Sequence, residues 1–296
     1  MNMKEYAFGI DLGGTTAKVG LFTTAGALLE KWEVATDTSN AGEHILGNLA
    51  KAVKDKMQEN GITAEQVEGV GVGVPGPVLD SRIVPIVCAN LGGWGERNVS
   101  IQLSGLLDGM KVLVGNDADV AALGEIWMGC AKGCRSTVMV TLGTGVGGGV
   151  IVNGRIIEGA HGAGGEIGHI SLDPQGPPCA CGKRGCLERL VSATSLHARL
   201  QCSDERMRAS ILREAGTYLG TALSIPVGLL DLADVCVYGQ SDIVNDTLLS
   251  AAQAQLDLLT GSSFHTRTII RRCECEGEIT LRGEALSVLH DYLENR

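Results

Sequence analysis

The segment between Glu166 and Glu188 carries the residues best suited to chemistry. It contains one histidine and three cysteines: His169, Cys179, Cys181 and Cys186. Zn²⁺ binds thiolate sulfur and imidazole nitrogen, and four protein ligands leave no position open for water. The spacing therefore predicts a structural zinc site that fixes the loop and holds Glu166, His169 and Glu188 in place.

Two other interpretations of this segment stay open. The three cysteines could be unrelated buried thiols, although the tight spacing and the Gly and Pro residues between them favour a metal site. The segment could also be a zinc ribbon that binds nucleic acid. Only Lys183, Arg184 and Arg189 are basic there, however, and the chain has a formal net charge of -10.

The composition bounds the class of protein. With 296 residues, 44% hydrophobic and 20% charged, the chain is expected to be a soluble globular protein of two domains. Its acidic balance disfavours nucleic acid and anionic membranes as partners. No apolar run approaches a membrane span, and no signal peptide precedes the first strand near Tyr6, so we expect a cytoplasmic protein. Ten cysteines fit that reducing compartment. Three would bind zinc and the others would be mostly free, with the C-x-C pair Cys273 and Cys275 incidental.

The elements that must position these residues follow a repeated plan. Three short strands are predicted at 6–10, 17–22 and 27–34, and three more at 137–141, 150–152 and 156–157. In each copy the first strand is followed by a Gly/Thr-rich turn, 11–16 in one and 142–149 in the other. Two such β-β-β units predict two similar domains that face each other across a cleft.

Helices and strands alternate through the rest of the chain, which is typical of an α/β fold. Strands are predicted at 67–74, 111–114 and 235–238. Helices are predicted at 43–59, 118–128, 192–200, 208–230, 243–259 and 283–293. Pro226 is expected to interrupt the fourth of these helices.

The two Gly/Thr-rich turns are candidate phosphate sites. Such a turn presents backbone N–H groups and small hydroxyls to an anion, and glycine lets the backbone approach it closely. Asp11, at the end of the first strand, suits a Mg²⁺ ion that keeps most of its waters. Either turn alone would also fit an ordinary tight hairpin, but two at equivalent places favour polyphosphate binding. No P-loop pattern is present.

Asp117 is the candidate catalytic carboxylate. It follows a predicted strand and opens a helix, so it could simply be an N-cap. A hydroxyl that attacks a γ-phosphate also needs an oriented proton acceptor, and aspartate serves that role well. Side chains that could bind the hydroxyls of a polyol are Glu166, His169, Glu188, Asn90, Asn98 and Asn116.

With these motifs in hand, the chain resembles the ROK family (repressors, open reading frames and sugar kinases), and within it the bacterial ATP-dependent glucokinases. The similarity runs from about Tyr6 to Ser195. It rests on five segments: Asp11–Thr16, Gly73–Pro77, Asn90–Trp94, Asn116–Glu125 and Leu142–Gly149. The zinc segment is similar as well, with His169, Cys179, Cys181 and Cys186 at the family's ligand positions.

The resemblance implies the actin-like ATPase fold, with an α/β domain at 1–114 completed by a helix at about 280–296. A second α/β domain would span 115–279 and carry the zinc-braced loop. Asp117 would be the catalytic base. Substrate contacts would come from Gly76, Asn90, Asn116, Asp117, Glu166, His169 and Glu188. ATP and Mg²⁺ would be held by Asp11, Gly13, Gly14, Thr15, Thr16, Lys18, Gly143, Thr144, Gly145, Gly147 and Gly148. A homodimer is usual in the family.

The last third departs from the pattern. The family's Gly-rich turn near the adenosine is replaced by Val237–Ser241, and its small-residue closing helix by Arg271–Glu278 and a polar tail. The leading hypothesis is an ATP-dependent glucokinase that acts on the 6-hydroxyl. N-acetylmannosamine, fructose and allose stay open as substrates. The alternative is a sugar-sensing regulator with weak or no kinase activity. It is disfavoured by the acidic charge and by the absence of a DNA-binding segment ahead of the first strand.

Overall fold

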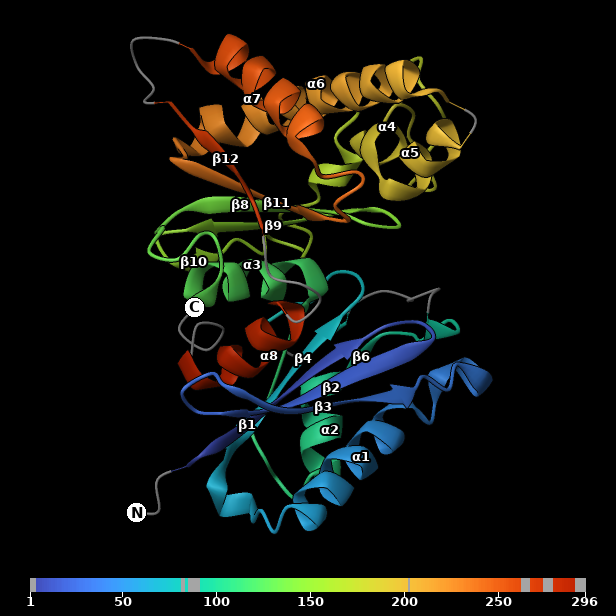
Figure 1. Ribbon diagram of the computed structural model, residues 1–296. Coiled ribbons are helices and arrows are strands. Elements are labelled where there is room, and N and C mark those ends of the chain that lie inside the picture. The colour runs from blue at the N-terminus through green and yellow to red at the C-terminus, as the bar shows by residue number, and fades with distance from the viewer. Residues whose placement is uncertain are drawn as a thin grey trace. The chain divides into compact units, whose positions relative to one another are not determined.

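The computed structural model describes residues 4–80, 83–84, 91–201, 203–261, 267–273 and 279–290. The chain divides into two compact units (Figure 1). Unit 1 comprises residues 1–124, 158–164 and 275–296, and unit 2 comprises residues 125–157 and 165–274. Each unit is built on a five-stranded sheet with helices, which confirms the predicted α/β class.

The sheet of unit 1 has the order β3-β2-β1-β4-β7. Its strands are β1 (Tyr6–Leu12), β2 (Thr16–Thr23), β3 (Leu28–Ala35), β4 (Val67–Val74) and β7 (Val112–Asn116). The first three form an antiparallel meander, whereas β4 and β7 run parallel to β1. The carboxyl ends of β1, β4 and β7 therefore meet at one edge of the sheet. A short hairpin pairs β5 (Ile83–Val84) with β6 (Arg97–Asn98).

Helices cover this sheet, with α1 (Ile45–Glu59) contacting β3 and α2 (Val99–Leu106) contacting β7 and α1. One-turn 3-10 helices, η1 (Ser39–Gly42) and η2 (Ala64–Gln66), flank α1. The last helix, α8 (Ile279–His290), packs closely on β1 and β4 (Figure 1). A Cβ on Gly71 of β4 would overlap the carbonyl oxygen of Glu284 in α8. Glycine at this position therefore lets the helix lie directly on the strand.

Unit 2 repeats the strand order of unit 1, which confirms the predicted repeat. Its sheet is β10-β9-β8-β11-β12. The strands are β8 (Thr137–Leu142), β9 (Val146–Val152), β10 (Arg155–Ile156), β11 (Asp234–Gly239) and β12 (Ile269–Arg272). Here too the first three are antiparallel, and β11 runs parallel to β8 and to the edge strand β12.

The helices of unit 2 are α4 (Leu187–Val191), α5 (Ala193–Leu200), α6 (Glu205–Leu230) and α7 (Asp246–Thr260). A one-turn helix, η4 (Ile167–His169), precedes them, and α3 (Asp117–Met128) runs from unit 1 into unit 2. The long helices α6 and α7 pack side by side (Figure 1). Gly216 and Gly220 of α6 allow this approach, because a Cβ on either would overlap a carbonyl oxygen of α7.

The helix predicted at 208–230 is longer than expected and is not interrupted, since α6 continues through Pro226 to Leu230. Proline removes one N–H donor from the helix. Leu223 and Val227 on either side of it are buried in the core of unit 2, so tertiary packing holds the final turn in place. The helix predicted at 283–293 begins four residues earlier, at Ile279.

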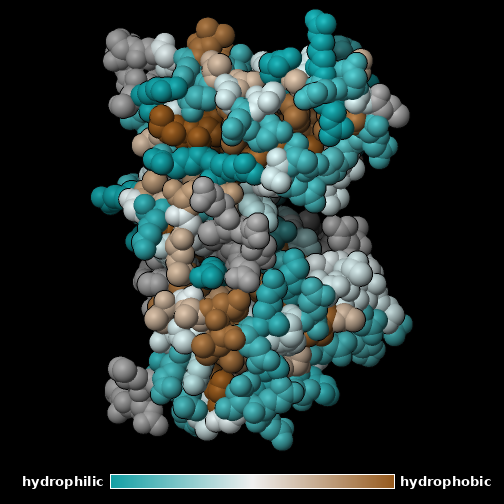
Figure 2. Space-filling model, in the orientation of Figure 1, coloured by the Kyte–Doolittle hydropathy of each residue, from teal (hydrophilic) through white to brown (hydrophobic). Residues whose placement is uncertain are grey.

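Large apolar side chains also reach the surface of unit 2 (Figure 2). Those on the last turns of α6 and α7 are Ile225, Leu229, Leu230, Leu258 and Leu259. Among the residues that the structure describes, no helix combines the length and the apolar character needed to cross a membrane.

Candidate active site

The first Gly/Thr turn connects β1 to β2. Residues 13–15 form the turn, and the Gly13 N–H donates to the Thr16 carbonyl at 3.2 Å. The Thr36 hydroxyl donates to the Gly13 carbonyl at 2.7 Å, and the Thr36 N–H donates to the Thr15 carbonyl at 3.0 Å. Thr36, the residue directly after β3, therefore helps to fix the shape of this turn.

Asp11 and Lys18 lie opposite each other on β1 and β2, directly below the turn. The Lys18 Nζ is 3.6 Å from the Asp11 Oδ2, and both side chains are partly exposed. Burial raises the pKa of Asp11, and the neighbouring lysine partly offsets that shift. A partly exposed carboxylate with one cationic neighbour, at the edge of a Gly/Thr turn, is suited to coordinate a hydrated divalent cation.

Asn116 and Asp117 lie at the same edge of the sheet. Asp11 is in register with Gly73 of β4, which is in register with Gly115 of β7. The Asn116 Nδ2 donates to the carbonyl of Gly76, the residue two positions after β4, at 3.0 Å. The carboxyl ends of three parallel strands thus place four predicted residues together, at the edge where open α/β sheets bind their ligands. These residues are Asp11, Gly76, Asn116 and Asp117.

The structure separates the roles of Asn116 and Asp117 at the start of α3. The Asn116 Oδ1 accepts hydrogen bonds from the N–H groups of Ala118 and Asp119, at 2.9 and 3.3 Å. Asn116 therefore performs the N-cap role. Asp117 is the first residue of the helix and half-buried, and its Oδ1 also accepts from Ala118 at 2.8 Å. Capping alone does not explain an aspartate at this position.

Glu284 of α8 is a residue that the sequence analysis missed. Its side chain is fully buried in unit 1, and its carboxylate lies against the backbone of Gly73, with no well-formed hydrogen bond from the described residues. Burial raises its pKa well above the usual value, and the negative charges of Asp11 and Asp117 raise it further. The sequence did contain a signal for this buried carboxyl group. Glu284 lies one helical turn from both Leu281 and Val288, which are buried on the same helix.

The second Gly/Thr turn connects β8 to β9 in unit 2. It is shorter than expected: residues 143–145 form the turn, whereas Gly147 and Gly148 lie within β9. Gly143 and Thr144 are exposed. Gly148 is buried, and a Cβ there would overlap the carbonyl oxygen of Gly165. Its lack of a side chain therefore serves the packing of β9 against the segment that carries Glu166.

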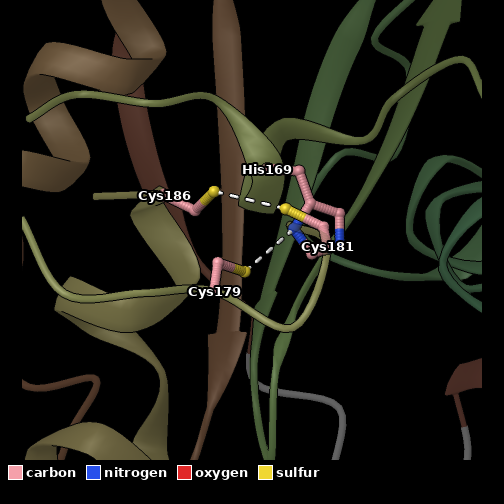
Figure 3. Close-up of side chains that lie close together, drawn as sticks. All are labelled: His169, Cys179, Cys181 and Cys186. Carbon is pink, nitrogen blue, oxygen red and sulfur yellow. Dashed lines mark hydrogen bonds between the residues drawn. The ribbon is translucent and has the colours of Figure 1, made fainter. Parts of the chain in front are cut away.

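The predicted zinc ligands converge in unit 2 (Figure 3). One nitrogen or sulfur atom from each of His169, Cys179, Cys181 and Cys186 lies within 4.8 Å of the others. The Cys179 Sγ is 3.7 Å from the His169 Nδ1, and the sulfurs of Cys181 and Cys186 are 3.6 Å apart. Thiolates bound to one tetrahedral zinc at 2.3 Å would be about 3.8 Å apart. Burial raises the pKa of the Cys186 thiol to about 12, so a thiolate at that position needs a cation beside it.

Glu188 connects this cysteine group to the second turn. Its Oε2 accepts a hydrogen bond from the Val146 N–H at 3.2 Å, and its Oε1 lies 3.8 Å from the Cys179 Sγ. Glu166 precedes η4, and its Oε2 is 3.9 Å from the Nε2 of His169. Both carboxylates predicted to bind substrate are therefore positioned by the segment that carries the cysteines.

Two asparagines remain from the prediction. Asn90 lies outside the described residues. Asn98 is the N-cap of α2, where its Oδ1 accepts from the Ile101 N–H at 2.9 Å. Its presence is thus explained by helix capping.

A family model described as the ROK family matches residues 7–222. The chain belongs to the ROK family. This ROK chain is 40% identical over 190 residues to a glucokinase of Halalkalibacterium halodurans. That match covers 64% of the chain but only 57% of the relative.

Two solved structures resemble this ROK chain over almost its whole length. The ROK hexokinase from Thermus thermophilus superposes with a TM-score of 0.80 at 30% identity, covering 95% of this chain and 97% of that one. A ROK family glucokinase from Streptomyces griseus, solved in complex with glucose and AMPPNP, gives 0.76 at 26% identity, with 95% and 98% covered. The fold is therefore the actin-like ATPase fold of the ROK kinases.

Proposed function

We propose that this chain is an ATP-dependent kinase that phosphorylates the 6-hydroxyl of a hexose, with glucose as the first candidate. The observation that carries the proposal is Asp117, an aspartate at the same sheet edge as Asp11, where the N-cap role is already taken by Asn116. The similarity to glucokinases supports the choice of substrate.

In this proposal Asp117 accepts the proton of the 6-hydroxyl as that oxygen attacks the γ-phosphate of ATP. The turns at 13–16 and 143–145 bind phosphate oxygens through backbone N–H groups and threonine hydroxyls. The residue suited to Mg²⁺ is Asp11, and the ion when bound would neutralise charge on the phosphates. Asn116, Gly76, Glu166, His169 and Glu188 are the proposed sugar contacts.

We also propose that the group of one histidine and three cysteines holds a structural Zn²⁺. The donor set supports it, as do the separations of 3.6 Å between the Cys181 and Cys186 sulfurs and 3.7 Å between the Cys179 Sγ and the His169 Nδ1. Its role would be to fix Glu166 and Glu188 relative to the second turn.

A homodimer in a reducing cytoplasm is the proposed state. The exposed apolar side chains at the ends of α6 and α7 support a protein partner. The described cysteines form no disulfide, which supports a reducing compartment.

The test is a coupled assay of ADP release with a panel of hexoses, comparing wild type with Asp117→Asn. Loss of a general base typically lowers kcat by about 10²- to 10⁴-fold. Asp246→Asn is the matched control, because Asp246 is the first residue of α7 as Asp117 is of α3. If wild type and Asp117→Asn turn over the same hexose at the same rate, Asp117 is not the base. If no hexose is turned over and the two proteins behave alike, the kinase proposal fails.

A sugar sensor without kinase activity is the second candidate. The observation that favours it is the divergent last third, since the family match ends at residue 222. The segment after β11 also lacks the usual Gly-rich turn near the adenosine and carries Gln240 and Ser241 instead. Isothermal calorimetry separates the two candidates: a sensor would bind hexose with no detectable ATP binding, whereas a kinase would bind both.

A further inference from the structure

A second group of cysteines lies in unit 2, away from the predicted zinc segment. The sulfurs of Cys130, Cys236 and Cys273 all lie within 4.8 Å of one another, and those of Cys130 and Cys273 are 3.6 Å apart. Cys130 follows α3, Cys236 is in β11, and Cys273 comes directly after the edge strand β12. The sequence analysis treated Cys273 as half of an incidental pair with Cys275, whereas the structure brings its thiol beside those of Cys130 and Cys236. Cys275 lies outside the described residues.

Glu125 is held beside this group. Its side chain is fully buried, and its Oε2 accepts a hydrogen bond from the Cys130 N–H at 2.7 Å. A Cβ on Gly129 would overlap that same oxygen, so only glycine lets the carboxylate fold back toward Cys130. The other oxygen, Oε1, has no hydrogen-bond partner within the part of the chain that the structure describes. Burial, and then the adjacent Cys130 thiol, raises the pKa of Glu125 to about 7.

Ordinary packing does not account for this arrangement. Buried cysteines often act as small apolar side chains, and three of them together could fill a core. A carboxylate buried among them with an unpartnered oxygen is costly in such a core. The three thiols form instead a set of sulfur donors of the kind that binds zinc, with the Glu125 carboxylate beside Cys130.

The two cysteine groups of the chain have matching dimensions. One sulfur–sulfur distance is 3.6 Å in each group, between Cys181 and Cys186 in one and between Cys130 and Cys273 in the other. Both are close to the separation of about 3.8 Å for two thiolates on one tetrahedral zinc. Each group also combines buried sulfurs with one partly accessible thiol, Cys181 or Cys130, through which an ion could enter.

We propose that Cys130, Cys236 and Cys273 form a second metal site that takes one Zn²⁺ ion, with the buried carboxylate of Glu125 beside it. Three thiolates select a borderline-soft cation over Mg²⁺ or Ca²⁺, which prefer oxygen ligands.

The position of the site in the chain indicates what the metal does. Glu125 is the first residue of unit 2, and Cys273 is the last but one. The site therefore links the two ends of this unit, because Cys130 and Cys273 are 143 positions apart in the sequence. It also anchors β12, an edge strand of four residues that pairs only with β11. A cross-link that closes so long a loop restricts the unfolded chain strongly.

The test is the zinc content of the full-length protein, purified with a thiol reductant and measured by elemental mass spectrometry. We expect two equivalents of zinc per chain in wild type and one in each of Cys181→Ser and Cys273→Ser. Cys134→Ser is the matched control and should keep both equivalents. Its thiol donates to the Asp234 Oδ2 at 3.2 Å and is not part of the group of three.

Wild-type protein alone supplies a second test that does not depend on the folding of a variant. When a mercurial reagent titrates the thiols, two equivalents of zinc should be released in separate steps, as followed with a zinc-binding dye. One equivalent in wild type, lost in Cys181→Ser and unchanged in Cys273→Ser, would overturn the second site while leaving the first. A Cys130–Cys273 disulfide in peptide mass spectra of the reductant-purified protein would overturn it as well.

Discussion

Replacing Glu284 with glutamine should stabilise unit 1, and the gain should grow with pH. The carboxyl group is fully buried without a well-formed hydrogen bond from the described residues, and its pKa lies well above 4.5. In the folded protein it keeps a proton that the unfolded chain releases at about pH 4.5. Above pH 4.5, folding therefore takes up a proton. The free energy of unfolding has its full value below pH 4.5 and falls as the pH rises toward the folded pKa of Glu284.

The magnitude follows from the linkage relation. Each pH unit between the unfolded and the folded pKa costs about 1.4 kcal/mol. From pH 5 to pH 7 wild type should therefore lose up to about 2.7 kcal/mol that Glu284→Gln keeps, if the folded group stays protonated throughout. Glutamine has nearly the same shape, so the change leaves the packing of α8 on β4 in place.

The assay is urea denaturation at pH 5, 6, 7 and 8, followed by tryptophan fluorescence. Two of the three tryptophans, Trp32 and Trp94, lie in unit 1, and Trp94 is fully buried. Glu33→Gln, at an exposed position of β3 in the same unit, is the control. A difference between Glu284→Gln and wild type that stays constant across the four pH values would refute the reasoning, because it would mean that the buried group does not titrate in this range.

Two further changes test other parts of the structure. Cys181→Ser should release the zinc of the first cysteine group, lowering metal affinity by at least about 100-fold, and hexose affinity should fall with it because Glu166 and Glu188 lose their support. Zinc analysis and calorimetry on the same sample check this, and full sugar affinity without zinc would contradict it. Gly220→Ala should destabilise the protein by about 1–3 kcal/mol, since the added Cβ overlaps the backbone of α7. Gly228→Ala, in the same helix with open space around it, should instead be neutral or stabilising by up to about 1 kcal/mol, so equal melting temperatures for the two variants would argue against the close packing.

The sequence predicted those features that are encoded locally. The two Gly/Thr turns, the repeated meander and the tight spacing of Cys179, Cys181 and Cys186 each lie within a few residues, where turn chemistry and side-chain period are informative. The strand order then follows from the repeat. The position of Asp117 at the same sheet edge as Asp11 could also be expected, because both lie at the carboxyl ends of parallel strands of one sheet.

The features that the sequence did not predict depend on contacts between distant segments. Glu284 is placed beside the carboxyl ends of β1 and β7 only because α8 returns to unit 1 from the far end of the chain. The thiols of Cys130 and Cys273 meet although these residues are 143 positions apart in the sequence. Pro226 stays inside a helix because neighbouring apolar side chains are held in the core. No local pattern reports such contacts, although a glutamate on an apolar helix face is a signal that can be sought in future sequences.

The return of α8 also has a consequence for synthesis of the protein on the ribosome. Strands β1 and β4 are made early, but the helix that covers them comes from residues 279–290, after the whole of unit 2. The residues of unit 2 end at 274, so this unit can fold before α8 has left the ribosome. Unit 1 cannot complete its fold until α8 is available, and one apolar face of its sheet stays exposed until then. Nascent chains that stall before residue 279 should therefore be prone to aggregate, and this first unit is where a chaperone would be needed.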